Sequence, residues 1–310
     1  MKFAPSVHQR IPMLAEGSVY ERLRRHASIQ FDPHLAHSTL IYTPAYAHLL
    51  EAVHREYWNV ARTHRLPMVA FTDTWRTNLE RLKRSIYLDR DVNQDNVRFL
   101  KHLRASYGAF GKQIFIGGMM GPRGDAYQPQ QALSRTTAER FHTYQVEALS
   151  EAEPDFLFAA TLPAFSEAHG IAHAMAQAGL PYILSFVIRP NGTLLDGVPL
   201  RNAIELIDAT VQTAPLGYSV NCVHPSVLVE ALGAGQIAGT PLLRRLVNFQ
   251  ANTSALPPEE LDNSPHLHEE NPQRFAATMA EVGSHFGIPI LGGCCGTDTR
   301  HIEQMARLIH

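Results

Sequence analysis

Short apolar segments that alternate with longer helical patterns are the feature that most restricts the fold of this chain. Each segment is nearly continuous in apolar character, as is typical of strands that are buried on both faces. The expected strands are IPML (11–14), PMVAFT (67–72), QIFIGGMMG (113–121), DFLFAAT (155–161), PYILSFVI (181–188), GYSVNCV (217–223), LVNFQAN (246–252) and IPILGGCC (288–295).

Helical patterns lie between many of these strands. Apolar residues recur with a helical period over 46–64, 137–153, 165–179, 272–287 and 299–309. Strands that alternate with helices in this way predict a closed (β/α)8 barrel, also called a TIM barrel, with an open doubly wound sheet as the alternative. Because the chain has 310 residues and no low-complexity linker, we expect residues 1–310 to form a single barrel domain.

The composition is that of an ordinary globular protein. The chain is 45% hydrophobic and 18% charged, and its net charge of −2 gives no electrostatic reason to expect a nucleic-acid partner. The N-terminal residues form no apolar signal segment, and no apolar run is long enough to span a membrane. Three cysteines are too few for a disulfide framework. We therefore expect a soluble, cytoplasmic protein with no membrane or nucleic-acid partner.

The three cysteines lie at the ends of two expected strands. Cys222 ends the sixth strand, and Cys294 and Cys295 end the eighth. The carboxyl ends of barrel strands face the catalytic mouth, so these sulfur atoms are expected to converge. Adjacent residues of a regular strand point to opposite faces, and the glycines of LGGCCG would allow the bend that brings both thiols together. Three thiolates suit Zn²⁺ and leave its fourth position open. The alternative is that the three side chains are small buried apolar groups.

The cysteine pattern resembles that of a known family. GGCCGTD (292–298) after a buried strand, together with Asn221-Cys222 earlier in the chain, is similar to the homocysteine S-methyltransferase family. Further segments are similar to this family in the same order along most of the chain. They are GPRGDAYQP (121–129), FHTYQVEAL (141–149), LSFVIRPNGTLLDGVPL (184–200) and QANTSA (250–255).

The resemblance implies a zinc barrel in which Cys222, Cys294 and Cys295 hold Zn²⁺ and the sulfur of homocysteine occupies the open position. The implied reaction moves a methyl group from a sulfonium or betaine-type donor to that sulfur. This chemistry is sound, because only a thiolate is a good nucleophile and a bound Zn²⁺ deprotonates a coordinating thiol. The transfer then depends on orientation, and it requires no general base.

Two carboxylates of the family are missing from this chain. Where family members have Asp-Gly-Gly after the first strand, the aligned residues are Ala15-Glu16-Gly17, and the Glu-Thr that ends the family's fourth strand is Ala160-Thr161 here. The resemblance assigns these carboxylates to the amino group of homocysteine. Homocysteine therefore stays the leading acceptor, but its amino group needs another partner. Glu16 is one candidate, and its alternative role is a carboxylate at a helix N-terminus.

The other candidate substrate contacts are Gly17, Asn221, Asn252 and Trp75. Trp75 follows the second strand, where an aromatic face would attract a cationic methyl donor, or where the ring would simply pack beneath a loop. Asn221 and Asn252 lie at strand ends, where each would bind polar substrate groups or cap a turn.

Two other classes of function remain open. A zinc hydrolase needs a carboxylate or histidine beside the metal, and His224, two residues after Cys222, is the one histidine in a position to support the site. A non-catalytic thiol- or metal-binding relative is the second alternative. The pairs His34/His37 and His266/His268 are expected to be exposed loop residues, and neither a dinucleotide fingerprint nor a phosphate-binding P-loop occurs.

Overall fold

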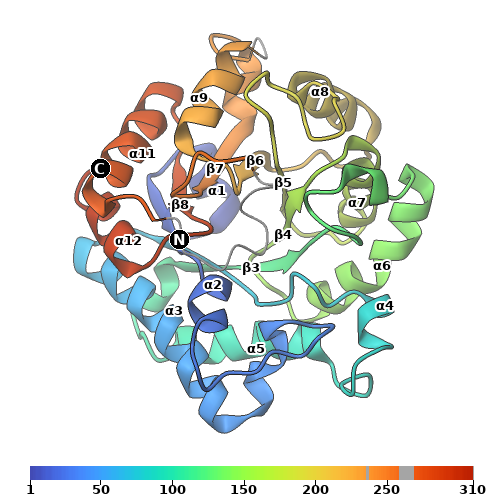
Figure 1. Cartoon of the computed structure of the whole chain (residues 1–310), viewed down its shortest axis with the longest axis vertical. Coiled ribbons are helices and arrows are strands. Elements are labelled where there is room, and N and C mark those ends of the chain that lie inside the picture. The colour runs from blue at the N-terminus through green and yellow to red at the C-terminus, as the bar shows by residue number, and fades with distance from the viewer. Residues whose placement is uncertain (235–236, 258–268, 310) are drawn as a thin grey trace.

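The computed structural model describes residues 1–234, 237–257 and 269–309. Eight parallel strands close into a barrel in sequence order, with a ring of helices around it (Figure 1). Pairing of Met13 with Ile290 and of Leu14 with Leu291 joins the first strand to the last and closes the sheet. The predicted (β/α)8 barrel is confirmed. The strands are β1 (Met13–Ala15), β2 (Met68–Phe71), β3 (Ile114–Met120), β4 (Phe156–Leu162), β5 (Tyr182–Phe186), β6 (Gly217–Asn221), β7 (Leu246–Ala251) and β8 (Ile290–Gly293).

The helices lie outside the strands, apart from one at the N-terminus. Each expected helical segment is a helix in the structure, and several more are present. The α-helices that the structure describes, expected and additional together, are α1 (Phe3–His8), α2 (Tyr20–Arg24), α3 (Pro44–His64), α4 (Leu79–Leu82), α5 (Val92–Ala105), α6 (Arg135–Glu151), α7 (Phe165–Ala176), α8 (Leu200–Thr210), α9 (Pro225–Ala234), α11 (Pro272–Phe286) and α12 (Thr299–Ala306). Short 3-10 helices are found at His37–Tyr42, Phe110–Gln113, Pro129–Gln131 and Pro241–Arg245.

The strands are buried on both faces, as their apolar runs predict. Residues that point into the barrel form one apolar cluster, which includes Ala15, Phe71 and Phe158. Those that point outward join the helices in a second, larger cluster. The amino-terminal end of the barrel is closed by α1, because Phe3 enters the inner cluster and stacks on Phe156 with ring centres 3.9 Å apart. The opposite end, where the strands finish, is the end at which the cysteines lie.

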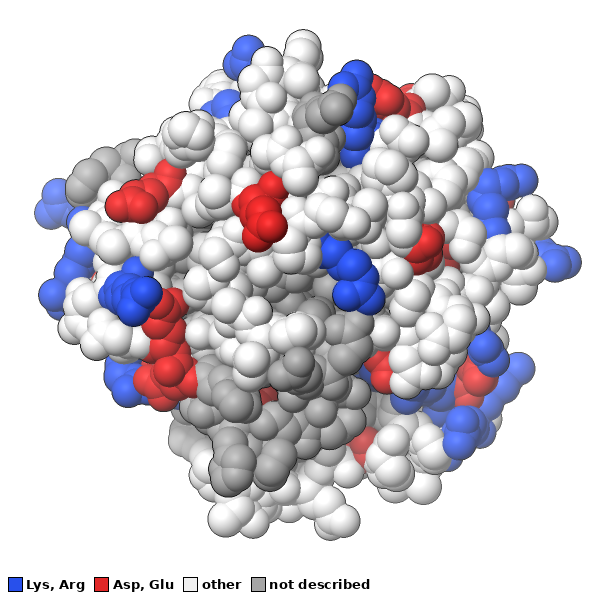
Figure 2. All heavy atoms as spheres, turned by 45° about the horizontal axis from the view of Figure 1, so that its top comes forward, with Lys and Arg blue, Asp and Glu red and all other residues white. Residues whose placement is uncertain are grey.

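Charged side chains are scattered over the face of the molecule that Figure 2 shows. In the view of Figure 2, Lys, Arg, Asp and Glu side chains are interspersed around the periphery, and no large area of one sign appears on this face. Among the residues that the structure describes, no helix is long and apolar enough to cross a membrane.

Candidate functional site

The three cysteine sulfur atoms meet at the carboxyl ends of β6 and β8. Their Sγ atoms all lie within 4.8 Å of one another. Strand β6 ends at Asn221 and β8 at Gly293, each two residues before the end that the sequence predicts, so the cysteines lie in the turns that follow these strands. Cys222 is buried, and Cys294 and Cys295 are half-buried. The predicted convergence of Cys222, Cys294 and Cys295 is therefore what the structure shows.

Two of these sulfur atoms are joined. Cys222 and Cys294 form a disulfide with their Cα atoms 5.5 Å apart, and Cys295 is a free thiol. A Cα separation of this size is usual for a disulfide. A three-sulfur metal site at this position requires that the Cys222–Cys294 pair be reduced.

The side-chain amide of Asn252 connects the two cysteine turns. Its Nδ2 donates to the carbonyl oxygen of Cys222 at 3.0 Å, and its Oδ1 accepts from the backbone N–H of Cys295 at 3.1 Å. Asn252 follows β7, the strand between the two turns, and it is buried. Its observed role is thus to hold the backbone of both turns, which is the alternative that the sequence left open for it.

Asn221 performs a similar function on the other side of Cys222. Its Oδ1 accepts from the backbone N–H of Thr161 at 3.0 Å and from the hydroxyl of Ser185 at 2.6 Å. Its Nδ2 donates to Thr161 Oγ1 at 2.8 Å and approaches Cys222 Sγ at 3.4 Å. The amide therefore joins the ends of β4, β5 and β6 beside the first cysteine.

The backbone at this end of the barrel is strained at two non-glycine residues. Thr161 has a φ of +61° and Cys222 a φ of +57°, in the left-handed region that L-residues with a side chain rarely adopt. Such conformations persist where surrounding contacts enforce them, and they cluster at functional sites. Here the bonds of Asn221 and Asn252 supply those contacts.

The glycines of the GGCCG turn are needed because neighbouring groups come very close. A Cβ atom on Gly292 would lie 2.6 Å from that of Ala15, and one on Gly293 would overlap the side chain of Thr297. Gly296 has a φ of +85°, which a side chain would oppose. The glycines thus let the chain turn tightly enough to direct two successive thiols to one place.

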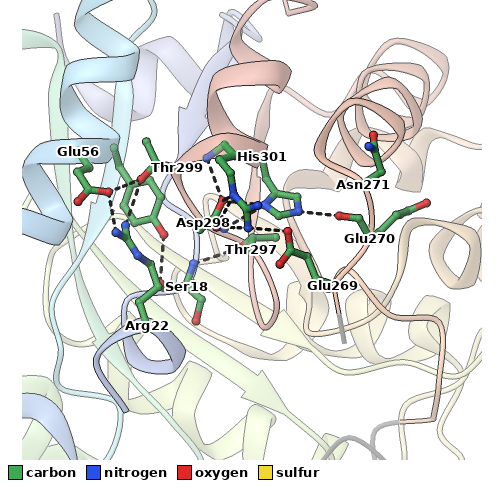
Figure 3. Close-up of polar contacts among 12 residues, drawn as sticks. Ser18, Arg22, Glu56, Glu269, Glu270, Asn271, Thr297, Asp298, Thr299 and His301 are labelled. Carbon is green, nitrogen blue, oxygen red and sulfur yellow. Dashed lines mark hydrogen bonds and ion pairs between the residues drawn. The ribbon is translucent and has the colours of Figure 1, made fainter. Parts of the chain in front are cut away.

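The residues after Cys295 are held in place by polar side-chain contacts, as Figure 3 shows. Thr297 Oγ1 accepts from the N–H of Ser18 at 3.1 Å, and Thr299 Oγ1 accepts from Arg22 Nη1 at 3.1 Å. Asp298 and His301 form a capping box at the start of α12. These contacts fix the cysteine turn against the segment that follows β1.

His224 lies near the site but its ring bonds elsewhere. Its Nδ1 is 2.8 Å from Ser226 Oγ, and its Nε2 is 3.3 Å from Glu270 Oε2. Among the described residues, the three cysteines are the one group of three or more cysteine, histidine or carboxylate side chains whose ligand atoms converge, and His224 is not part of it. His266 and His268 fall outside the described residues.

Glu16 is directed away from the cysteines, into the wall between the barrel and α3. Its Oε1 accepts from Trp58 Nε1 and lies beside His54 Nδ1, both at 2.7 Å, and its Oε2 accepts from the N–H of Phe71 at 3.2 Å. The Glu16 carboxylate is thus bonded to three partners in the wall, and it is not the helix N-terminal group that the sequence offered as its alternative role. The sequence contains no local signal for this pairing, because His54 lies 38 residues further along the chain.

The same network buries a second carboxylate. His54 Nε2 lies 3.2 Å from Asp73 Oδ2, and His37 Nε2 lies 3.0 Å from Asp73 Oδ1. His37 is only 5% exposed, so its prediction as an exposed loop residue is wrong. Burial alone lowers the pKa of His54, but the charges of Glu16 and Asp73 outweigh it and raise this pKa to about 10.

Trp75 and Gly17 both occupy tightly packed positions at the mouth. The indole Nε1 of Trp75 donates to the carbonyl oxygen of Ala160 at 3.2 Å, and Arg76 lies 4.0 Å from its ring centre. One face of the indole is therefore already covered by a cation. A Cβ atom on Gly17 would lie 2.8 Å from Tyr57 Oη, so packing alone explains a glycine there.

The thiol of Cys295 is in an environment that favours its neutral form. Burial raises its pKa to about 12, the negative charge of Glu21 adds to this effect, and Arg24 and Arg25 oppose it. These three charged residues belong to α2 and the residue after it. Without a cation, the Cys295 sulfur remains protonated at neutral pH.

The donor set fits a thiophilic metal. Three sulfur ligands around Zn²⁺ at about 2.3 Å would lie roughly 3.8 Å from one another, a spacing that the three cysteines reach with small movements. Sulfur donors with no carboxylate among them favour zinc over the hard cations magnesium and calcium. The residues at this site could therefore hold a metal ion once the disulfide is reduced.

The chain is similar in sequence and in fold to known methyltransferases. The model of the homocysteine S-methyltransferase family matches residues 13–309. The homocysteine S-methyltransferase of Escherichia coli (strain K12) is 28% identical over 220 residues, which are 68% of each chain. The crystal structure of the homocysteine methyltransferase MmuM from Escherichia coli in its metallated form superimposes with a TM-score of 0.74 at 20% identity, over 98% of both chains. The oxidized form of MmuM gives 0.73 at 21% identity, over 96% of both.

Proposed function

The chain belongs to the homocysteine S-methyltransferase family, and from this premise we propose that it is a zinc-dependent S-methyltransferase. The proposed reaction moves a methyl group from a sulfonium or betaine-type donor to the sulfur of a thiol, with homocysteine as the leading acceptor. The observation that carries the proposal is the cluster of three cysteine sulfur atoms, all within 4.8 Å, at the open end of the barrel.

The residues proposed to hold the metal are Cys222, Cys294 and Cys295. When bound, Zn²⁺ would keep the acceptor's sulfur as a thiolate next to the three cysteine sulfurs, which is the reactive form at neutral pH. The chain itself supplies orientation, because Asn221 and Asn252 hold the backbone of both cysteine turns through their side-chain amides. A fixed acceptor and an aligned donor account for much of the rate of such a displacement.

The proposed substrate contacts are Gly17, Asn221, Asn252, Trp75 and Glu16. Ala15 and Ala160 both point into the apolar interior of the barrel, so the positions of the two missing carboxylates carry no charge. Glu16 would have to release one of its three partners before it could bind an amino group.

A carboxylate of α2 acts electrostatically on one of the cysteines. Glu21 acts electrostatically on the thiol of Cys295 and is paired with Arg24 and Arg25. We therefore include Glu21 as a candidate partner for the amino group of the acceptor. A donor that carries a carboxylate next to its methylated cation would suit the arginines on this side of the mouth.

The contacts of Trp75 restrict how a cationic methyl donor can approach the site. Arg76 covers one face of Trp75, so a cationic donor would have to approach the other face or a different wall. A small donor that diffuses to the site is the simplest arrangement.

A direct experiment tests the function. Reduced, zinc-loaded protein is incubated with homocysteine and either S-methylmethionine or betaine, and methionine is measured by mass spectrometry. We expect the native protein to form methionine with at least one of the two donors. A Cys295→Ser variant should form no methionine and should also lose its equivalent of bound zinc. Stoichiometric zinc without any methyl transfer would instead indicate a non-catalytic metal-binding relative.

A matched variant distinguishes a catalytic from a merely structural metal. Thr278→Ser changes a half-buried residue on α11 whose hydroxyl donates to the carbonyl oxygen of Arg274 on the same helix, so it should retain both zinc and activity. If Cys295→Ser loses thermal stability but keeps methyl transfer, the cysteine cluster is structural and the proposed mechanism is wrong.

A further inference from the structure

Two histidines on the outer wall of the barrel face each other one helical turn apart. The Nε2 atoms of His169 and His173 on α7 are 3.3 Å apart, with ring centres separated by 4.9 Å. Both side chains are half-buried. Thr210, the last residue of α8, places its Oγ1 atom 2.8 Å from His169 Nε2. The two imidazoles and this hydroxyl therefore converge between α7 and α8, which are neighbours in the helical ring (Figure 1).

The protons of His169, His173 and Thr210 are too few to give each of the contacts between these groups its own hydrogen bond. Thr210 donates its hydroxyl proton to the carbonyl oxygen of Leu206 at 2.5 Å, so its oxygen presents lone pairs to His169. A neutral imidazole carries one proton on either Nδ1 or Nε2. If His169 holds it on Nε2, that one proton must serve both Thr210 and His173. If His173 donates instead, His169 and Thr210 face each other with two lone pairs.

A cation would satisfy all three groups at once. Imidazole nitrogens bind zinc at about 2.0–2.1 Å, and a tetrahedral angle then separates two such nitrogens by roughly 3.3–3.4 Å. The observed separation of 3.3 Å between the two Nε2 atoms matches this value. Histidines four residues apart on a helix lie on the same face, so the helix itself maintains the spacing.

We propose that His169 and His173 form a second metal site, which chelates a divalent ion of the zinc class with the oxygen of Thr210 directed to the same point. Imidazole donors suit zinc, copper and nickel, and they do not suit calcium or magnesium. The remaining coordination positions would be filled by water. Because the ligands come from α7 and α8, the bound ion fastens these two helices together.

The surroundings favour the neutral imidazole that a metal requires. Phe165 stacks on His169 with ring centres 5.2 Å apart. Burial lowers the pKa of His169, the positive charges of His173 and Arg135 lower it further, and Glu139 opposes them. A low pKa leaves the ring nitrogens free of competing protons at neutral pH.

Calorimetry on the full chain tests the proposal. Reduced protein that already holds one equivalent of Zn²⁺ is titrated with further Zn²⁺ at neutral pH. We expect a second equivalent to bind with micromolar affinity, and His169→Gln and His173→Gln each to weaken that step at least tenfold. His48→Gln, which alters an exposed histidine on α3, should leave it unchanged. Zinc binding that His173→Gln leaves unchanged at every equivalent would overturn the proposal.

A measurement on the unmodified protein covers the case in which a variant fails to fold. Diethyl pyrocarbonate modifies accessible imidazoles, and modified positions can be mapped by peptide mass spectrometry. Zinc should protect His169 and His173 from the reagent and leave His48 reactive; equal modification with and without zinc would contradict the proposal. The outcome does not depend on the cysteine site, because failure of that site would remove only the first equivalent.

Discussion

Replacement of Asn252 by leucine is the change that most directly tests how the chain assembles the cysteine cluster. Leucine has a similar size and no hydrogen-bonding group. In the native protein the amide bonds the carbonyl oxygen of Cys222 and the N–H of Cys295, at 3.0 and 3.1 Å. Asn252→Leu leaves both backbone groups without this partner in a buried setting.

The expected cost follows from these two bonds. A buried backbone group that loses its partner costs about 1–3 kcal/mol, so the loss of both partners should lower the free energy of unfolding by about 2–6 kcal/mol. The turns would also be held less firmly in the geometry that the metal needs. Loss of a group that orients metal ligands typically weakens metal affinity by roughly 10–100-fold.

Two assays separate these effects. Urea unfolding of the reduced, metal-free protein measures the loss of stability, and competition with a chromophoric chelator measures zinc affinity. Asn248→Leu, which removes a buried amide earlier in the same strand, is the control and should alter stability without a change in zinc affinity. If Asn252→Leu destabilises the protein but binds zinc as tightly as the native chain, the amide does not couple the two turns to the metal site.

The remaining predictions concern pH, packing and oxidation. The pKa of His54 is raised to about 10 in the folded protein against about 6.5 when unfolded, so its stabilising effect is complete below pH 6.5 and is lost as the pH rises through 10. Urea unfolding of the native chain should show this decline of a few kcal/mol, and His54→Gln should largely lack it. Gly17→Ala should lower stability by about 1–3 kcal/mol, measured in the same way, because the added Cβ would lie 2.8 Å from Tyr57 Oη. Oxidised protein, in which Cys222 and Cys294 are joined, should bind less than one equivalent of zinc by mass spectrometry, and a reductant should restore it.

Each of these results has a control and a contradicting outcome. His48→Gln should keep the pH dependence of the native chain; a decline that persists in His54→Gln would assign it to another group. Gly233→Ala places a Cβ in open space within α9 and should stabilise slightly, so similar losses in both glycine variants would disprove the packing argument. Zinc binding that is indifferent to reductant would show that the joined cysteines are not ligands.

The architecture and the cysteine cluster were predictable because both depend on local patterns. Strands such as Phe156–Leu162 are buried on both faces, and their continuous apolar runs reveal them directly. Once the strands were placed, the topology of a barrel brought Cys222, Cys294 and Cys295 together. The glycines around the cysteine pair indicated the tight turn that the structure shows.

The polar wall behind the mouth was not predictable in the same way. Glu16, His54, Asp73 and His37 come from four separate segments, and nothing in their spacing shows that they share one buried network. The coverage of Trp75 by Arg76 likewise depends on side-chain packing that adjacent letters do not reveal. Chemistry limits metal ligands to a few residue types that can be recognised in a sequence, whereas substrate contacts at strand ends depend on side-chain packing.

The measurement that tests the central claim most directly is zinc X-ray absorption on the reduced protein, with and without homocysteine. The account predicts one zinc ion with three sulfur ligands and one lighter ligand, changing to four sulfur ligands when homocysteine is added. Zinc that keeps three sulfur ligands in the presence of homocysteine would contradict homocysteine as the acceptor. Absence of stoichiometric zinc under reducing conditions would contradict the proposed mechanism as a whole.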